Sequence, residues 1–301
     1  MARILTPRRG IERYLHEREF EVRACLKSIH VSSTFSVDGI VATQLARLEA
    51  LQAAKVDFAS DALHVDWNRV DLRRASAACA FEQFRARAWA LGELNQSLSS
   101  TYTNLYHLTF ADTADRRRSG ALKRFNLAAY KRRIRKALTP LQESFSEIWA
   151  VGMVEISATP TSDDAVLFEP HCHLLVDGVP SMDLRAAFKS VLKKRSSALR
   201  PVQLEPVRTP ADRARVLSYF FKQVPELRSQ IVGVDGRLIR GRSNHLTGAA
   251  KVEWLAWMAG HHVTELLISI GPPAGVIEKF EYRDLQPIID ELLKAGIEHD
   301  N

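Results

Sequence analysis

The sequence predicts an α+β fold in which an antiparallel sheet is covered by helices. Between residues 99 and 225 the apolar pattern alternates between the period of two that is typical of strands and the 3.6-residue period of helices. Turn-forming residues at 158–164 join two strand patterns into a hairpin. The flanking regions, 1–98 and 226–301, have mainly helical patterns, so we expect them to be added helical regions.

The N-terminal region is predicted to contain helices. Apolar residues recur three and four positions apart along residues 11–26, about 38–54 and about 67–98, which is the spacing of one helical face. No chemical motif occurs there. The roles left open to this region are duplex binding or protein contacts.

The core region begins with a strand, a helix and the hairpin. Residues 104–110 (NLYHLTF) are rich in β-branched, aromatic and apolar residues, which favour a strand. A basic helical segment follows over 120–145, and Pro140 is a potential break in it. Residues 149–157 and 166–176 are the two predicted strands of the hairpin.

The second half of the core adds a helix, a strand and another helix. Ser181 can cap a helix that has an apolar stripe at helical spacing. The stripe consists of Leu184, Phe188, Val191 and Leu192. Residues 201–207 are predicted as a short or edge strand because of their prolines. Thr209 followed by Pro210 predicts the start of the last core helix.

The core therefore reads strand, helix, strand, strand, helix, strand, followed by one more helix. This is the split β-α-β order of ferredoxin-like domains, whose sheet is antiparallel. The C-terminal region combines a Gly- and Arg-rich link, a Trp-bearing helix near 251–260 and a closing helix that ends at Ala295-Gly296. We expect a ferredoxin-like sheet with helical additions at both ends.

The composition is that of an ordinary globular protein of 301 residues with a formal net charge of +7. A positive charge favours an anionic partner, because neutralised phosphates release counterions. No run of about 18 apolar residues occurs and the first residues lack the apolar core of a signal peptide, so we expect no membrane segment and a cytoplasmic location. Cys25, Cys79 and Cys172 are too far apart to support a disulfide framework or a cysteine zinc site.

Two histidines one residue apart, His171 and His173, stand in an otherwise apolar strand pattern. Alternate side chains of a strand share a face, so both imidazoles can bind one ion. Glu155 on the other hairpin strand can join them if the register allows it, and Glu169 and His107 are the alternatives. This mixed nitrogen and oxygen set leaves open positions and suits Mn²⁺ or Mg²⁺ no worse than Zn²⁺. The structural alternative is a pair of buried histidines that only satisfy hydrogen bonds.

Tyr219 and Lys222 are three residues apart and share one face of the last core helix. A phenol ordinarily has a pKa of about 10, so a tyrosine nucleophile needs a nearby cation or a metal-polarised substrate. Lys222 can supply that positive charge. The alternative is that Tyr219 packs into the core beside Phe220 and Phe221, with Lys222 as a solvated charge.

A dense basic stretch between residues 116 and 136 is the candidate DNA-binding segment. Its members are Arg116, Arg117, Arg118, Lys123, Arg124, Lys131, Arg132, Arg133, Arg135 and Lys136. Such a segment suits a phosphate backbone, which positions a nucleic acid without reading its sequence.

Three motifs follow one another in the core. They are the strand LYHLTF, the His171-Cys172-His173 triplet with Glu155 upstream, and Tyr219 with Lys222 on a later helix. In this order they resemble the three motifs of HUH endonucleases, and more narrowly those of replication initiator proteins of rolling-circle plasmids and phages. The resemblance covers about residues 100–224.

The resemblance implies a metal-dependent endonuclease and nucleotidyltransferase. An ion on His171, His173 and Glu155 would polarise a scissile phosphate in single-stranded DNA, and Tyr219, helped by Lys222, would attack it. The products would be a 5′-phosphotyrosyl link and a free 3′-hydroxyl that primes a polymerase. The implied role is initiation of rolling-circle replication at an origin, with Mn²⁺ or Mg²⁺ as cofactor and a host helicase and DNA polymerase as partners.

The chain departs from the family pattern at some positions. Family members with two tyrosines place the second about one turn away, but Arg215 and Gln223 stand there, which favours the single-tyrosine class. His107 stands where members often have a hydroxyl or apolar residue, and no carboxylate for termination is identified. The alternatives are a transposase or relaxase with the same core, a non-catalytic DNA-binding regulator, or a small-molecule metalloenzyme. The origin sequence and the oligomeric state do not follow from the sequence.

Overall fold

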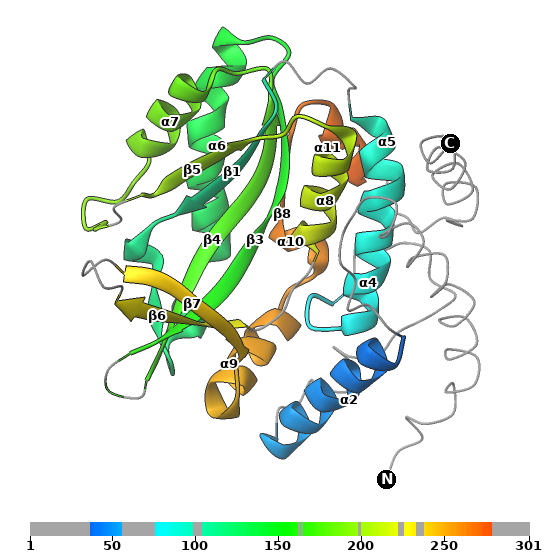
Figure 1. Cartoon of the computed structure of the whole chain (residues 1–301), viewed down its shortest axis with the longest axis vertical. Coiled ribbons are helices and arrows are strands. Elements are labelled where there is room, and N and C mark those ends of the chain that lie inside the picture. Colours follow the sequence, from blue (N-terminus) through cyan, green and yellow to red (C-terminus); the bar gives the residue numbers. More distant parts are fainter. Residues whose placement is uncertain are drawn as a thin grey trace.

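The computed structural model of the protein describes residues 37–55, 76–98, 104–161, 163, 165–197, 200–221, 226–232 and 238–278. These residues form one sheet with helices on both of its faces (Figure 1). The helix expected at 11–26, the closing helix and Lys222 lie outside them. No helix in the described ranges is long and apolar enough to cross a membrane.

The described part of the chain contains both helices and strands. The helices are α2 (Val37–Ala53), α4 (Ala80–Trp89), α5 (Asn95–Ser97), α6 (Leu127–Ser144), α7 (Ser181–Ser190), α8 (Pro210–Phe220), α9 (Gly248–Ala259), α10 (Val263–Leu266) and α11 (Pro272–Glu278). The strands are β1 (Tyr106–Ala111), β2 (Arg117–Arg118), β3 (Trp149–Pro160), β4 (Val166–Asp177), β5 (Val202–Pro206), β6 (Glu226–Val232), β7 (Leu238–His245) and β8 (Leu267–Ile270). A π-helical turn (Ala90–Leu94) joins α4 to α5, and short 3-10 turns (Thr113–Asp115 and Leu122–Arg124) flank β2.

The main path of the sheet runs β5-β1-β4-β3-β6-β7, with β2 paired to β4 and β8 paired to β3. All of these pairings are antiparallel except the single parallel contact of β3 with β6. This confirms the predicted α+β class and the antiparallel sheet. β5 ends the path, as its prolines predicted.

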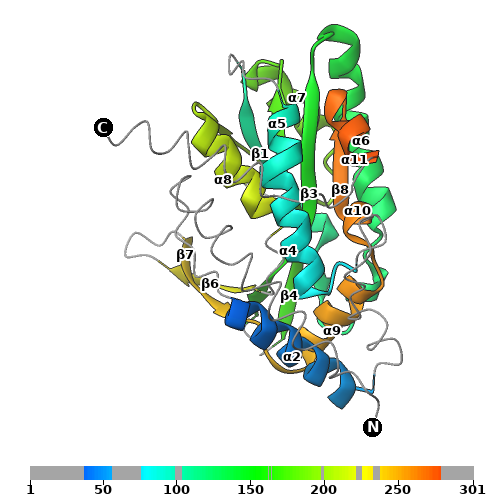
Figure 2. The same ribbon diagram turned by 90° about the vertical axis from the view of Figure 1, so that its right-hand side faces the viewer.

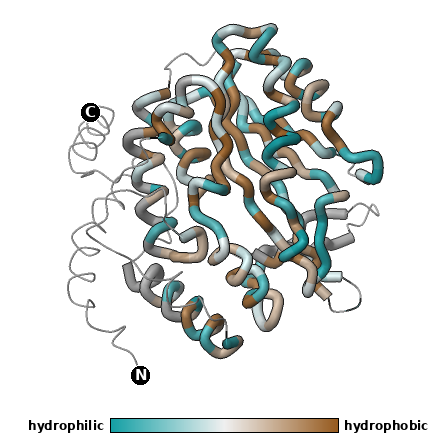
Figure 3. The backbone as a smooth tube through the Cα atoms, turned by 180° about the vertical axis from the view of Figure 1, so that it is seen from behind, coloured by the Kyte–Doolittle hydropathy of each residue, from teal (hydrophilic) through white to brown (hydrophobic). Residues whose placement is uncertain are grey.

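The centre of the sheet is the β3–β4 hairpin, which pairs from Trp149 opposite Asp177 to Pro160 opposite Val166. Figure 3 shows the central strands as mainly apolar, which is typical of strands covered on both faces. Phe110 of β1 and the buried Cys172 of β4 point to one face, where the Phe110 ring lies 5.3 Å from that of Phe188 on α7. The opposite face carries the histidines.

The two sheet faces are covered by different helices. Figure 2 shows α6 and α8 on opposite sides of the sheet. The ring of Tyr130 on α6 contacts Phe110 at 6.1 Å between centroids, whereas Tyr219 on α8 contacts His173 at 5.4 Å. Because alternate residues of a strand face opposite ways, α6 lies across the sheet from the histidines.

Helix α8 is fixed at its start and along its outer side. Thr209 caps it by accepting a hydrogen bond from the Asp212 N–H at 3.0 Å, as predicted. The Nε of Arg213 donates to Oδ1 of Asn95 at 2.8 Å, and the ring of Phe221 lies 6.3 Å from that of Trp89. The N-terminal helices α4 and α5 therefore hold α8 against the sheet.

Several helix boundaries differ from the sequence-based expectation. Helix α6 runs through Pro140 without a break and ends at Ser144. Pro180, not Ser181, occupies the N-cap position of α7, and no side chain caps that helix. Residues 67–75 of the helix expected from about residue 67 lie outside the described residues; Ser76 forms a β-bridge with His262, and α4 starts at Ala80.

The C-terminal region contributes strands as well as helices, which corrects the prediction of a mainly helical addition. β6, β7 and β8 all join the main sheet, and β8 pairs directly with β3 from Ala150 to Met153. β8 has only four residues, so its apolar run could not be told from part of a helix by periodicity. β6 and β7 are rich in polar residues, which hid their strand pattern.

One buried ionic network fixes α6 to the sheet. Arg133 donates to Oδ2 of Asp112 at 2.7 Å and also pairs with Asp115. Asp115 accepts from Nζ of Lys193 at 2.6 Å, and Oδ2 of Asp112 also accepts from the Lys193 N–H. The two carboxylates are almost fully buried, so they depend on these cations. Arg133 was a candidate DNA contact, and its side chain is instead engaged within the protein.

We expect replacement of Arg133 by Met to lower the free energy of unfolding by about 3 kcal/mol, because it leaves two buried carboxylates short of a cation. Urea denaturation at neutral pH measures this change. Arg132→Met is the matched control, since Arg132 is exposed on the same helix and its loss should cost about 0.5 kcal/mol or less. Equal changes in the free energy of unfolding for the two substitutions would contradict the assignment of Arg133 to a buried ionic network.

Candidate metal centre

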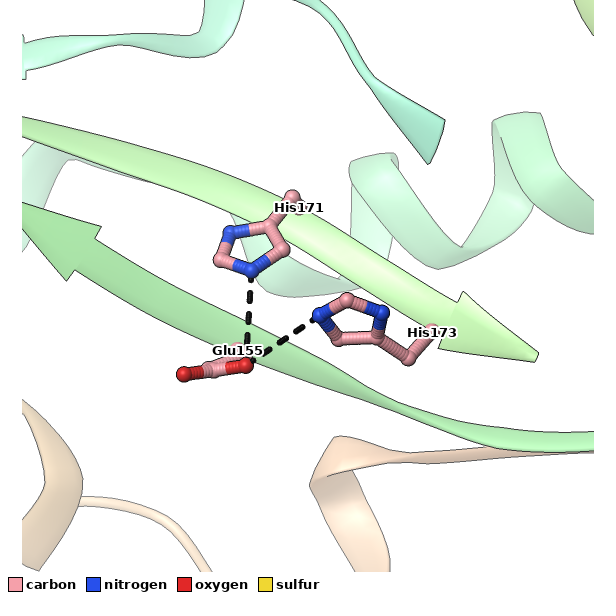
Figure 4. Close-up of side chains that lie close together, drawn as sticks. All are labelled: Glu155, His171 and His173. Atoms are coloured by element: carbon pink, nitrogen blue, oxygen red, sulfur yellow. Dashed lines mark ion pairs between the residues drawn. The ribbon is translucent and has the colours of Figure 1, made fainter. Parts of the chain in front are cut away.

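Glu155, His171 and His173 converge on one face of the β3–β4 hairpin. Glu155 lies directly opposite His171 in the register, and His173 is two residues further along β4. Oε2 of Glu155 is 3.3 Å from Nε2 of His171 and 3.3 Å from Nε2 of His173 (Figure 4). All three side chains are buried, and their ligand atoms lie within 4.8 Å of one another. The register thus settles the third member of the group as Glu155.

The backbone fixes the tautomer of His171. Its Nδ1 lies 3.0 Å from the carbonyl oxygen of Glu169. A carbonyl can only accept, so Nδ1 carries the proton and the neutral ring presents a lone pair at Nε2. That buried Nε2 makes no hydrogen bond within the described structure. A lone pair facing a carboxylate oxygen needs a proton or a cation between them, which fits a metal site.

The carboxyl group of Glu155 is held in its charged form. Burial alone would raise its pKa, but the adjacent imidazoles of His171 and His173 lower the pKa well below its usual range. A charged carboxylate and two imidazoles form a set that binds a divalent cation and leaves coordination positions open. These residues therefore fit a metal ion, although the donor atoms alone do not select one metal.

Gly152 allows β3 to approach β4 closely beside this group. A Cβ atom at position 152 would overlap the carbonyl oxygen of His173 and press on the backbone of Leu174. The glycine thus sets the backbone position from which His173 extends. The sequence pattern did not predict that a glycine is required here.

Tyr219 stands beside the metal group. Its ring lies perpendicular to that of His173, with 5.4 Å between centroids, and its side chain is half-buried. Phe220 and Phe221 are buried instead. Tyr219 is thus more exposed than these two phenylalanines, and its ring contacts His173.

The other two candidate ligands have different partners. Glu169 pairs with Arg116 at 2.5 Å and accepts from Oγ1 of Thr159 at 2.8 Å. His107 contacts the far side of His173, with 3.1 Å between its Nε2 and Nδ1 of His173. Both residues border the group without joining it.

Sequence reasoning missed the role of Arg215, which appeared only as a departure from a two-tyrosine pattern. It lies one helical turn before Tyr219 on α8, so the two side chains share a helical face. The guanidinium is largely exposed and is near enough to lower the pKa of His107. The exposed cation of Arg215 therefore lies close enough to affect His107, which borders the metal group.

Burial and the charges of His173 and Arg215 lower the pKa of His107 from 6.5 to about 3. At pH values between the two pKa values, position 107 is protonated in the unfolded chain but not in the folded chain. The free energy of unfolding therefore falls as the pH drops from 6.5 to about 3. In metal-free protein, we expect His107→Gln to make this fall in the free energy of unfolding smaller by on the order of 1 kcal/mol per pH unit. Urea unfolding of both proteins at several pH values tests this, and parallel pH profiles would contradict it.

Most of the basic candidates do not gather at the metal group, and Arg116 is the exception because it pairs with Glu169, which borders the group. Arg118, Lys123, Arg124, Arg132, Arg135 and Lys136 are exposed. Arg118 pairs with Asp163, Arg117 donates to the carbonyl oxygens of Ala114 and Arg116, and Lys131 donates to that of Glu265. Those on α6 lie across the sheet from the histidines, so they cannot contact a phosphate bound at that site.

Comparisons with protein-family models, with curated proteins and with solved structures find no match to this chain.

Proposed function

We propose that this protein is a metal-dependent, site-specific enzyme that nicks and rejoins single-stranded DNA through a 5′-phosphotyrosyl intermediate and initiates rolling-circle replication. The observation that carries this proposal is the position of Tyr219, whose ring contacts His173 of the buried Glu155, His171 and His173 group. A nucleophile and a cation-binding group so close together suit attack on a phosphodiester.

The topology supports the same proposal. Taken alone, the strands of the core follow the order β5-β1-β4-β3, and the connections through α6 and α7 each cross one intervening strand. This is the split β-α-β order of ferredoxin-like domains. The histidines lie on a central strand and the tyrosine on the helix after β5, which is the arrangement implied by the resemblance to HUH endonucleases.

The reaction would exchange one phosphodiester for another. A divalent ion held by Glu155, His171 and His173, Mn²⁺ or Mg²⁺ in our proposal, would orient the scissile phosphate and neutralise its charge. The Tyr219 hydroxyl would lose its proton as its oxygen bonds to phosphorus and the bond from phosphorus to the 3′ oxygen breaks. The leaving oxygen would take up a proton and become a free 3′-hydroxyl, and the reverse reaction would rejoin the strand.

Arg215 suits an anionic substrate at this face. Its exposed guanidinium is one turn from Tyr219 and can pair with a phosphate next to the one attacked. The exposed basic residues of α6 would contact DNA only if the strand or its flanking duplex reaches the other sheet face. Origin DNA, a helicase and a polymerase are the partners that this role requires.

The proposal is tested by incubating the protein with circular single-stranded DNA and Mn²⁺, followed by denaturing gel electrophoresis. We expect cleaved DNA and a protein–DNA adduct that resists detergent, both absent when EDTA is added. DNA binding without cleavage or adduct would favour the non-catalytic regulator instead.

A further inference from the structure

His107 and Thr109 form a polar group behind the metal centre, on the same face of β1. Thr109 lies opposite His173 in the register, and His107 lies two residues away from it along the strand. Nδ1 of His173 is 3.0 Å from Oγ1 of Thr109 and 3.1 Å from Nε2 of His107. Both distances are those of hydrogen bonds.

The two ring nitrogens of His173 have different roles. Nε2 points to Glu155 at 3.3 Å and must present a lone pair to bind a cation. The proton of the neutral ring must then be on Nδ1, and a buried N–H needs an acceptor. Among the described residues, the hydroxyl oxygen of Thr109 and the unprotonated Nε2 of His107 lie within hydrogen-bond distance and can accept.

The neighbours of His107 fix its own orientation. If its Nε2 accepts, its proton is on Nδ1, which lies 3.7 Å from the carboxylate of Glu205. Its ring stacks at a tilt against His173, with 5.2 Å between centroids, and approaches Phe220 on α8 at 6.5 Å. The ring therefore bridges the sheet and the helix that carries Tyr219.

We propose that His107, together with Thr109, is a positioning residue that holds His173 in the tautomer and ring orientation that bind the metal ion. Residues that accept a hydrogen bond from a ligating imidazole fix its tautomer and raise its basicity, and their loss typically weakens metal binding about 10- to 100-fold. Glu205 is largely exposed, so water screens its charge and its contribution is small. This inference rests on the metal site of the proposed function, but it does not depend on the DNA chemistry.

The test compares Mn²⁺ affinity, measured by electron paramagnetic resonance of free Mn²⁺, across a set of variants in the absence of DNA. His107→Phe keeps a ring beside Phe220 but removes the acceptor, so we expect about 10-fold weaker binding. His107→Gln places an amide oxygen near the former Nε2 and should bind within about threefold of wild type. His107→Phe combined with Thr109→Val removes both acceptors and should weaken binding about 100-fold.

Thermal unfolding in EDTA gives the second readout. We expect His107→Phe to unfold within a few degrees of wild type, so that its weaker binding cannot be explained by misfolding. The inference would be overturned if the double variant bound Mn²⁺ with wild-type affinity. It would also be overturned if His107→Phe and His107→Gln lost the same amount of Mn²⁺ affinity.

The outcome also separates this inference from the proposed reaction. A protein that binds Mn²⁺ with the expected order of affinities but forms no DNA adduct would support the positioning role and contradict the nicking function. A wild-type protein that binds no Mn²⁺ would overturn both.

Discussion

Tyr219→Phe is expected to abolish the covalent protein–DNA adduct and to reduce cleavage of single-stranded DNA by more than about 1,000-fold. The substitution removes one oxygen atom and keeps the ring that packs against His173. Fold and metal binding should therefore persist while the nucleophile is lost. Quantitative gel analysis of adduct and cleaved strand, with Mn²⁺ present, measures the effect.

Tyr106→Phe is the matched control for this experiment. Tyr106 lies on β1, but it alternates with His107 and so points to the sheet face away from the histidines. The variant should form the adduct at the wild-type rate. Adduct formation by Tyr219→Phe at more than a few per cent of the wild-type rate would show that another residue is the nucleophile.

Glu155→Gln is expected to weaken Mn²⁺ binding by more than about 100-fold, equivalent to about 3 kcal/mol. It removes the negative ligand between two imidazoles at nearly constant shape. The same substitution should lower the stability of the metal-free protein at neutral pH, because the imidazoles that depress the pKa of the Glu155 carboxyl stabilise its charged form in the folded state. Calorimetric titration and thermal unfolding in EDTA measure the two effects.

The loss of metal affinity distinguishes a metal site from a structural polar cluster. A cluster that serves only stability would lose stability on substitution and show no metal affinity to lose. Glu205→Gln is the control, since it removes a carboxylate at an exposed position of β5, which pairs with β1 and not with β3 or β4. Unchanged Mn²⁺ affinity in Glu155→Gln would contradict the assignment of this ligand.

The central part of the fold and the metal group were predictable because they depend on local patterns. Alternation in the β3 and β4 segments fixed which residues share a face, and the hairpin turn limited the register. His171 and His173 then had to point the same way, and the observed pairing of Glu155 with His171 completed the group. The cap at Thr209 similarly fixed the start of the helix that carries Tyr219.

Other features depend on contacts between distant segments. Arg133 has the sequence context of a surface arginine, and only the fold brings Asp112 and Asp115 to it. The role of His107 requires the pairing of β1 with β4, which a single sequence does not specify. The strands of the C-terminal region are short or polar, and their pairing with an existing sheet stabilises them more than their own propensity does.

The most direct test of the account is to locate the covalent bond. The adduct is digested with nuclease and trypsin, and the peptides are sequenced by tandem mass spectrometry. We predict that the peptide from Val216 to Lys222 carries a nucleotide joined through its 5′-phosphate to Tyr219. Recovery of that peptide unmodified, with the nucleotide on another residue or absent although the DNA has been cut, would contradict the account.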